Sequence, residues 1–224
     1  HDLKNPLNNI LGFSELLTTM PRLSNEKKEY YQELIYKSAE SMTDLLENLL
    51  KWSSAQRGKT SINPVPFNIY ELTNICIDLL YPSAENKKIS LQNHVDPVIT
   101  VYADKDMITT VIRNLVSNAI KFTPHGGSVM IETREKQQEI IVSVKDTGIG
   151  IAPENITKIF NIEENYSSRG TKGEKGTGLG LILCKEFVEK NGGKIWVESE
   201  YEKGSTFYFT LNTSAENKSD DKSC

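Results

Sequence analysis

The sequence predicts an α+β protein in which an N-terminal helical hairpin precedes a domain built as an α/β sandwich. Apolar residues recur at alternating four- and three-residue spacing in residues 3–20 and 24–52, as they do on one face of a helix. Short apolar strand candidates then alternate with three sizeable helical segments in residues 67–211. A stretch containing proline and glycine separates the two patterns, which indicates two domains joined by a linker.

The composition limits the kind of protein that this chain can be. Its 224 residues are 38% hydrophobic, which suffices for a sizeable core. A net charge of -4 spread over both signs argues against an electrostatic nucleic-acid binder. The 3 cysteines lack metal-ligand spacing and indicate a reducing compartment. No apolar run approaches the roughly 18 to 20 residues of a membrane span. The sequence begins inside a helical pattern, so we expect it to be part of a longer protein.

The helical hairpin is predicted for residues 1–57. The first helix ends near Pro21 and presents one amphipathic face, formed by Leu3, Leu7, Ile10, Ser14 and Leu17. Ser24 can cap the second helix, whose apolar stripe continues to Trp52 over a length of some 40 Å at about 1.5 Å per residue. Two such helices cannot enclose a core by themselves. We therefore expect the hairpin to dimerise into a four-helix bundle.

The linker is predicted at residues 58–66, and the second domain at residues 67–211. Asn68 and Glu71 have capping-box spacing and open a helix that runs to about residue 85. Asp104 caps a later helix. Strand candidates lie at residues 89–95, 98–102, 128–134, 139–144, 194–199 and 206–211, with a short helix after Pro153 and a longer helix from Leu179. These elements predict a mixed sheet with helices packed on one face. Residues 212–224 are rich in Ser, Asn, Asp and Lys, and we expect a disordered tail there.

Two glycine-rich turns frame a candidate ligand site. The strand before Asp146 delivers this carboxylate to the end of the sheet, where Gly148 and Gly150 allow close approach of backbone. The second turn, residues 176–180, opens into a helix whose first N–H groups can bind phosphate. Neither turn contains the Gly-Lys-Ser/Thr ending of a P-loop. Ordinary tight turns are the alternative interpretation.

The helix after Asp104 carries a polar face beside its buried stripe. Asn114, Asn118 and Lys121 share this face at i, i+4 and i+7. Amide oxygens can ligate Mg²⁺ without adding negative charge, and a lysine ammonium can neutralise a phosphate oxygen. A solvated polar face is the alternative interpretation.

Four segments resemble the sequence motifs of sensor histidine kinases of two-component systems. The phosphoacceptor box is matched by HDLKNPL (residues 1–7), the N box by NLVSNAIKFT (114–123), the G1 box by DTGIG (146–150) and the G2 box by GTGLGL (176–181). They occur in the family's order and cover nearly the whole chain. The resemblance implies a dimerisation and histidine-phosphotransfer hairpin, followed by a Bergerat-type ATP-binding domain of the superfamily shared with gyrase B and Hsp90.

The resemblance also implies roles for individual residues, with ATP and Mg²⁺ as cofactors. His1 would accept the γ-phosphoryl group, Asp2 would orient its imidazole and take its proton, and Asn5 would orient water for dephosphorylating the partner. Asp146 would accept a hydrogen bond from the adenine amino group, and Asn118 would ligate Mg²⁺. The other residues expected at the nucleotide are Asn114, Lys121, Phe122, Gly148, Gly150, Arg169, Lys175, Gly176, Thr177, Gly178, Leu179 and Gly180. Residues 161–175 would form the ATP lid, although Ile162 and Glu163 replace the second aromatic residue of the family's F box after Phe160.

The predicted function is that of an ATP-dependent protein-histidine autokinase. It would relay phosphoryl from His1 to an aspartate of a response-regulator receiver domain and would also act as a phosphatase of that partner. We expect the cytoplasmic portion of a membrane-anchored bacterial sensor, with membrane contact only through upstream segments. The alternatives are a hydrolytic ATPase of the gyrase and Hsp90 kind, which would need a glutamate where Asn114 stands, and a non-catalytic ATP-binding dimerisation module. His94 and His125 lie outside the acceptor box, so we interpret them as structural.

Overall fold

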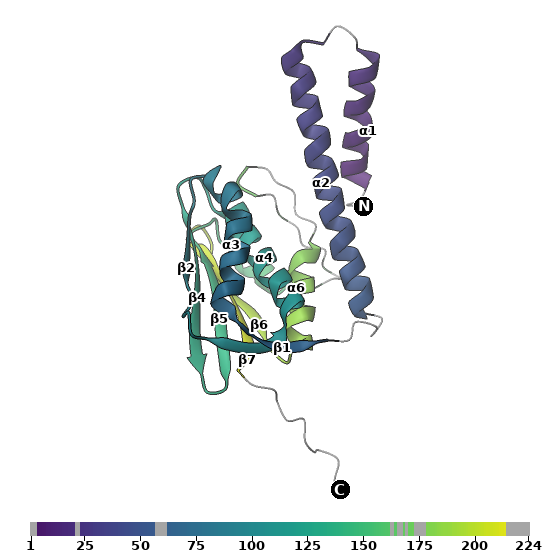
Figure 1. Cartoon of the computed structure of the whole chain (residues 1–224). Helices are drawn as coiled ribbons and strands as arrows, with labels where there is room; N and C mark the ends of the chain where they lie inside the picture. Colours follow the sequence, from purple (N-terminus) through teal and green to yellow (C-terminus); the bar gives the residue numbers. More distant parts are fainter. Residues whose placement is uncertain are drawn as a thin grey trace. The chain divides into compact units, whose positions relative to one another are not determined.

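The computed structural model describes residues 4–20, 23–56, 62–161, 164, 168, 170–172 and 178–213. The chain divides into two compact units, His1–Thr60 and Ser61–Cys224, which are described separately below (Figure 1). Among the described residues, none of the helices is both long enough and apolar enough to cross a membrane.

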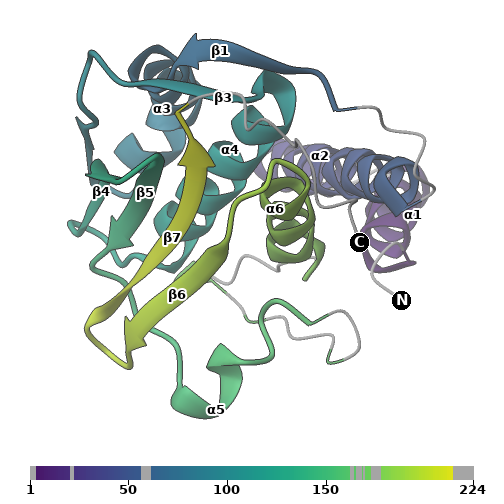
Figure 2. The same cartoon turned by 90° about the horizontal axis from the view of Figure 1, so that it is seen from below.

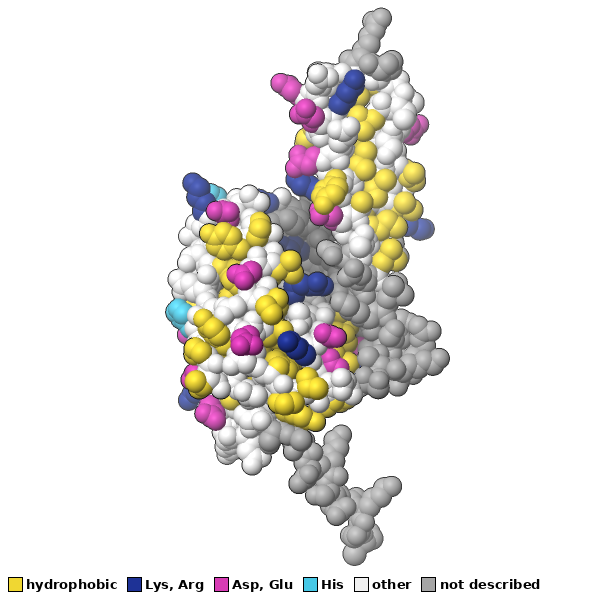
Figure 3. Space-filling model, viewed as in Figure 1, with side chains coloured by type: hydrophobic (Ala, Val, Ile, Leu, Met, Phe, Trp, Pro, Cys, Tyr) yellow, Lys and Arg dark blue, Asp and Glu magenta, His cyan; other side chains and the backbone are white. Residues whose placement is uncertain are grey.

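The first unit is a hairpin of two helices, α1 (Lys4–Thr19) and α2 (Asn25–Gln56). Ser24 precedes α2, and its Oγ accepts a hydrogen bond from Lys27 N at 3.4 Å, as the sequence predicts for a helix cap. The rings of Phe13 and Tyr31 stack at 5.5 Å between centroids and join the two helices. Hydrophobic side chains nevertheless gather on the hairpin surface (Figure 3), where the exposed large ones include Leu7, Leu11, Tyr30, Tyr36 and Leu46. The hairpin alone therefore leaves much of its apolar surface uncovered.

A seven-stranded mixed sheet forms one layer of the second unit. Its strands are β1 (Pro64–Asn68), β2 (Ser90–His94), β3 (Thr100–Asp104), β4 (Ser128–Lys136), β5 (Glu139–Asp146), β6 (Ile195–Glu200) and β7 (Gly204–Asn212). The strand order is β1-β3-β7-β5-β4-β2, and β6 pairs with β7 outside this path. Strands β2 and β4 run parallel, whereas the other pairs are antiparallel. The predicted mixed sheet is thereby confirmed.

Helices α3 (Ile69–Glu85), α4 (Lys105–Phe122) and α6 (Leu179–Lys190) cover one face of this sheet (Figure 2). A short helix, α5 (Pro153–Ile156), follows the turn after β5. Burial alternates along β5, where Ile140, Val142 and Val144 face the helices and are almost fully buried. The predicted caps are also confirmed, because Asn68 Oδ1 accepts from Glu71 N and Asp104 Oδ1 accepts from Met107 N, both at 3.0 Å. The α/β sandwich is therefore the predicted one.

The sequence prediction was wrong at both edges of this domain. Residues 64–66, assigned to the linker, belong to strand β1, which pairs with β3. Proline lacks an N–H group, and such a strand is tolerated here because β1 lies at the edge of the sheet. At the other end, Asn212 completes β7, and Thr213 N donates to Gln138 O at 3.1 Å, so neither belongs to a disordered tail. Residues 214–224 lie outside the described residues. The remaining domain boundaries stay predictions.

Candidate active site

Asp146 is the buried acidic residue at the end of β5. It follows Val142 and Val144 on the inward face of the strand, and only 5% of the residue is exposed. Its Oδ1 accepts hydrogen bonds from Gly148 N at 2.8 Å and Ser205 N at 3.3 Å, whereas Oδ2 has no partner among the described residues. Burial raises the pKa of Asp146 to about 6, against the opposing effect of the two backbone donors. The site therefore holds a carboxylate with one oxygen fixed and one available.

Gly148 allows this arrangement because no side chain fits at its position. A Cβ atom added there would lie 2.5 Å from Asp146 Oδ1 and 2.7 Å from Phe122 O. Without that atom, the Gly148 N–H reaches the carboxylate, and Ile149 N donates to Phe122 O at 3.2 Å. The turn after β5 is thus fixed to the last residue of α4.

Gly150 is constrained by a neighbouring hairpin, and its predicted contact with the nucleotide stays a prediction. Its φ of +66° favours glycine, and an added Cβ would lie 2.1 Å from Glu200 O in the β6–β7 hairpin. Glu202 N also donates to Ile149 O at 2.8 Å. The structure therefore explains Gly150 by the close approach of two backbone segments, and no contact with a ligand is needed to account for it.

The polar face of α4 lies between the β5 turn and the start of α6. Asn114 is close to α6, because a Cβ atom added at Gly180 would lie 3.6 Å from Asn114 Oδ1. The Nδ2 atom of Asn114 is buried, makes no hydrogen bond to an oxygen or nitrogen atom of the described residues, and lies beside the Cys184 thiol. Asn118 is half-buried on the same helix. At the end of α4, Lys121 Nζ lies 4.7 Å from the centroid of the Phe122 ring and donates to Ser168 O at 3.4 Å.

The first turn of α6 begins without a side-chain cap. Gly178 precedes the helix in the left-handed conformation, with φ 70° and ψ -14°, and it offers no side chain to cap the first N–H groups. Leu179 and Gly180 are the first two helical residues. Backbone N–H groups at a helix start carry partial positive charge and bind phosphate well. The Asn114 amide and this helix start are neighbours.

Several predicted site residues lie outside the described residues, namely His1, Asp2, Arg169, Lys175, Gly176 and Thr177. Of the predicted lid, residues 161, 164, 168 and 170–172 are described. Asn5 lies in the first turn of α1, where it is half-buried. Asn5 belongs to the first compact unit, whereas the nucleotide-site residues belong to the second, so they form two separate sites.

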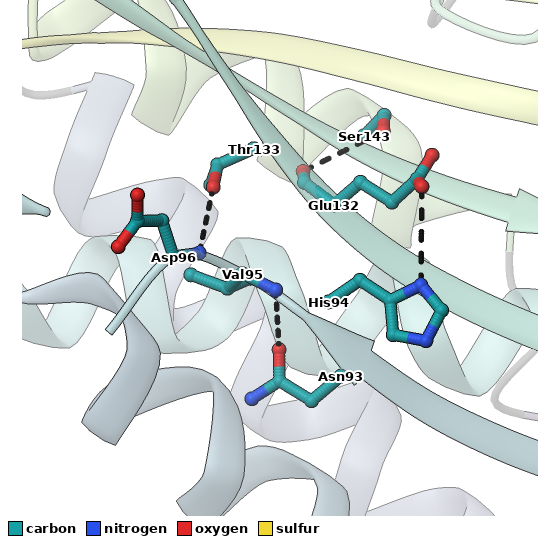
Figure 4. Close-up of polar contacts among 7 residues, drawn as sticks. All are labelled: Asn93, His94, Val95, Asp96, Glu132, Thr133 and Ser143. Atoms are coloured by element: carbon teal, nitrogen blue, oxygen red, sulfur yellow. Dashed lines mark hydrogen bonds and ion pairs between the residues drawn. The ribbon is translucent and has the colours of Figure 1, made fainter. Parts of the chain in front are cut away.

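The two remaining histidines lie in ordinary surface positions. His94 ends β2, and its Nδ1 lies 4.0 Å from Glu132 Oε1 of the neighbouring strand (Figure 4). Beyond His94, Val95 N donates to Asn93 Oδ1 and Asp96 N donates to Thr133 Oγ1, both at 3.1 Å. These contacts fasten the chain after β2 without involving the His94 side chain, so the structural role of His94 stays a prediction. His125 is exposed in the turn after α4.

Sequence reasoning missed the contribution of Ser205 and Gly204. The antiparallel register places Ser205 opposite Asp146, so that its N–H reaches the carboxylate. Gly204 has a φ of +120°, and a Cβ atom added there would lie 2.1 Å from Asp146 O. Ser205 supports Asp146 through strand pairing, and Gly204 allows the close backbone approach beside it. The sequence predicts a strand at residues 206–211 but does not reveal which strand it pairs with.

Within the described part of the chain, no group of three or more His, Cys, Asp or Glu could hold a metal ion by itself. The amide oxygens of Asn114 and Asn118 are suitable ligands for a hard cation such as Mg²⁺, which commonly takes one or two protein ligands together with phosphate oxygens. The residues present therefore fit a magnesium-nucleotide better than an isolated metal ion.

The family comparisons agree with this geometry in both units. Residues 103–215 match the family described as histidine kinase-, DNA gyrase B-, and HSP90-like ATPase, and residues 1–58 match the His Kinase A (phospho-acceptor) domain. The chain belongs to the sensor histidine kinases. The first match includes every nucleotide-site residue described above, from Asn114 to Ser205. The two matches occur in the order expected for the catalytic core of a histidine kinase of two-component signalling.

Individual relatives extend this likeness over nearly the whole chain. The sensor histidine kinase GacS of Pseudomonas protegens is 33% identical over 218 residues, which are 95% of this chain and 24% of GacS. The chain thus spans about a quarter of the length of curated relatives such as GacS.

Two solved histidine kinases share the architecture. Full-length ShkA in complex with AMPPNP is 27% identical, with a TM-score of 0.70 over 96% of this chain and 45% of ShkA. ThkA in complex with the response regulator protein TrrA is 26% identical, with a TM-score of 0.74 over 97% of this chain and 60% of that chain. The second unit is therefore the ATPase-family domain of a histidine kinase.

Proposed function

We propose that this chain binds ATP and transfers the γ-phosphoryl group to His1, from which it passes to an aspartate of a response-regulator receiver domain. The observation that carries the proposal is the carboxylate of Asp146. One of its oxygens is held by two backbone N–H groups, while the other has no partner among the described residues. A buried acceptor of this kind suits the exocyclic amino group of adenine, since the amine replaces the hydrogen bonds that burial removes.

The phosphates would lie between α4 and α6. The first N–H groups of α6 after Gly178, close to Asn114, and the ammonium of Lys121, two helical turns after Asn114, would supply positive charge to the phosphates. Asn118 would ligate Mg²⁺ through its amide oxygen, and the ion would supply neutralisation of the phosphate charge. On the sequence resemblance alone, Phe122 and the G1 and G2 glycines would line the nucleotide. Arg169, Lys175, Gly176 and Thr177 belong to the same proposal.

The chemical step requires a neutral imidazole at His1. Its unprotonated ring nitrogen would form a bond to the γ-phosphorus as the bond between that phosphorus and the β,γ-bridging oxygen breaks, and ADP leaves. The proton on the other ring nitrogen would pass to the carboxylate of Asp2, which also orients the ring. The protein contributes mainly by positioning and charge neutralisation.

The first unit would supply both the dimer and the partner surface. The exposed apolar side chains of the hairpin, such as Leu11 and Tyr36, support a homodimer in which two hairpins form a four-helix bundle. The complex of the related kinase ThkA with the response regulator TrrA supports a receiver domain as partner. Asn5, one turn after His1, would orient water for dephosphorylating that partner. No contact with nucleic acid is proposed.

Hydrolysis of ATP to ADP and free phosphate is a weaker candidate. The hydrolytic relatives of this superfamily activate water with a glutamate one helical turn before the Mg²⁺-binding asparagine, where this chain has Asn114. An amide has no basic lone pair with which to accept a proton from water. The water reaction should therefore be slow compared with transfer to His1.

Nucleotide selectivity tests the role of Asp146 directly. At pH 7.5, the ATP analogue AMPPNP should bind at least about tenfold more tightly than the guanine analogue GMPPNP, because guanine presents a carbonyl oxygen where adenine presents its amino group. Isothermal titration of the 224-residue chain with both analogues in the presence of Mg²⁺ gives the comparison. Equal affinities would contradict adenine recognition by Asp146.

A further inference from the structure

Lys87 is a buried lysine in the turn between α3 and β2. Only 4% of the residue is exposed, and its Nζ donates to Ile120 O and to Lys121 O, each at 2.9 Å. These two carbonyls belong to the last turn of α4, where helical carbonyls lack intrahelical donors and carry partial negative charge. The ammonium of Lys87 thus supplies donors from another element to the end of α4.

The carbonyl of Lys121 is shared with the segment between α5 and α6. Thr171 N donates to it at 3.1 Å, and Thr171 Oγ1 lies 3.1 Å from the same oxygen and 3.0 Å from Thr123 O. In addition, Lys172 Nζ donates to Asn86 O, next to Lys87, at 3.1 Å. Residues 170–172 therefore dock where Lys87 meets the end of α4.

This last turn of α4 also supports the nucleotide site. The side chain of Lys121 donates to Ser168 O at 3.4 Å, and Phe122 O accepts from Ile149 N of the Asp146 turn at 3.2 Å. A shift of the turn would move the Lys121 ammonium and the backbone beside Asp146 together. The contacts of Lys87 thus hold a part of α4 on which both the phosphate side and the adenine side of the proposed site depend.

We propose that Lys87 is a positioning residue for nucleotide binding, which holds the end of α4 and, through the shared Lys121 carbonyl, the docked residues 170–172. The inference rests on the proposed binding of ATP, but its first readout does not. A lysine that only caps a helix would stabilise the whole domain without acting selectively on residues 170–172. The two roles therefore differ in what changes when the ammonium is removed.

The test uses Lys87→Met, the conservative Lys87→Arg, and Lys88→Met as a matched control at the exposed neighbour. In Lys87→Met without nucleotide, hydrogen exchange at the Thr171 amide should rise about tenfold, since the carbonyl that receives it is no longer held by the ammonium. The dissociation constant of AMPPNP should also rise about tenfold. Lys87→Arg should restore most of both properties, and Lys88→Met should leave both unchanged.

A double-mutant cycle identifies the shared carbonyl as the route. Thr171→Val removes the hydroxyl, and its effect on AMPPNP binding should be smaller in the Lys87→Met background than in the wild type. If the two substitutions changed the dissociation constant of AMPPNP by independent factors, the proposal would be overturned. So would a Lys87→Met variant that lowers global stability but leaves both Thr171 exchange and AMPPNP affinity unchanged.

Two further outcomes are decided by the same measurements. If Lys87→Met does not fold, Lys87→Gln takes its place, because it removes the charge and its side chain is one bond shorter. Unchanged Thr171 exchange in Lys87→Gln would show that the ammonium is not needed and would overturn the proposal. If the wild-type chain binds no AMPPNP, the proposed function fails. Exchange at Thr171 then still shows whether Lys87 holds residues 170–172, and unchanged exchange would reject that contact as well.

Discussion

Replacing Asp146 with asparagine should change nucleotide affinity and apo stability in opposite directions. The amide oxygen of asparagine can still accept the hydrogen bonds from Gly148 N and Ser205 N that fix Oδ1 in the native protein. Its NH₂ group, however, turns a donor toward the adenine amino group. Losing this partner should weaken binding about ten- to hundredfold at pH 7.5. The fold itself should remain intact.

The stability effect follows from the pKa of the carboxyl group, which burial raises from 3.8 to about 6. Because the folded-state pKa lies above the unfolded-state value, protonation of Asp146 favours the folded protein. This contribution is fully present below the unfolded pKa of 3.8 and is lost as the pH rises through about 6. The difference corresponds to about 3 kcal/mol. Asparagine does not ionise, so the apo variant should be more stable than the wild type at pH 7.5, by up to about 3 kcal/mol.

Thermal unfolding followed by circular dichroism at pH 7.5 and pH 4.5 measures this difference, at about 2 to 4 °C in Tm per kcal/mol for a domain of this size. The advantage of Asp146→Asn should shrink at pH 4.5, where the wild type also carries a neutral side chain. In wild type, the affinity for AMPPNP should fall below about pH 6, as Asp146 becomes protonated. A stability difference that does not change with pH would refute burial as its cause. Unchanged AMPPNP affinity in Asp146→Asn would remove this residue from the site.

Two other substitutions test the metal ligand and the backbone contact. In Asn118→Ala, titrations with and without Mg²⁺ should give the same AMPPNP affinity. Ser117→Ala, at the exposed neighbour, should still bind AMPPNP more tightly when Mg²⁺ is present. A full Mg²⁺ effect in Asn118→Ala would exclude Asn118 as a ligand of the ion. Gly150→Ala should lower the free energy of unfolding in urea by about 2 to 3 kcal/mol, because its Cβ would meet Glu200 O. Gly126→Ala, where φ is +82° but the space is open, should cost only about 1 kcal/mol, so equal costs at the two glycines would contradict the close approach.

Much of the fold could be predicted because local signals and the hydrophobic pattern agree. The caps at Asn68 and Asp104 mark helix starts in the sequence and form the predicted hydrogen bonds in the structure. Strand β1 was missed because Pro64 and Pro66 are typical of linkers. Only the position of β1 at the sheet edge makes prolines acceptable there, and an edge position is a property of the assembled sheet.

Some residues of the candidate site could be predicted from local sequence motifs, whereas others are recognised only from contacts between distant parts of the chain. The acidic residue at position 146 and the amides of α4 could be singled out from their motifs. Ser205, 59 residues from Asp146 in the chain, and Lys87, 34 residues from Lys121, act through contacts that only strand pairing and helix packing create. Gly150 shows the reverse problem. Gly150 lies within a ligand-site motif, yet the atom that leaves no room for a side chain there is Glu200 O of the β6–β7 hairpin.

The proposed function requires that phosphoryl moves from ATP to His1 of this chain. The most direct measurement is incubation with γ-labelled ATP and Mg²⁺, using a version of the chain in which an added helical segment precedes His1, followed by acid and alkali treatment of the labelled protein. The label should be lost in acid and kept in alkali, as a phosphoramidate is. His1→Ala should take up no label. Its AMPPNP affinity should stay within about twofold of the wild type, because the two sites act independently. An acid-stable label, or acid-labile label that persists in His1→Ala, would contradict the account.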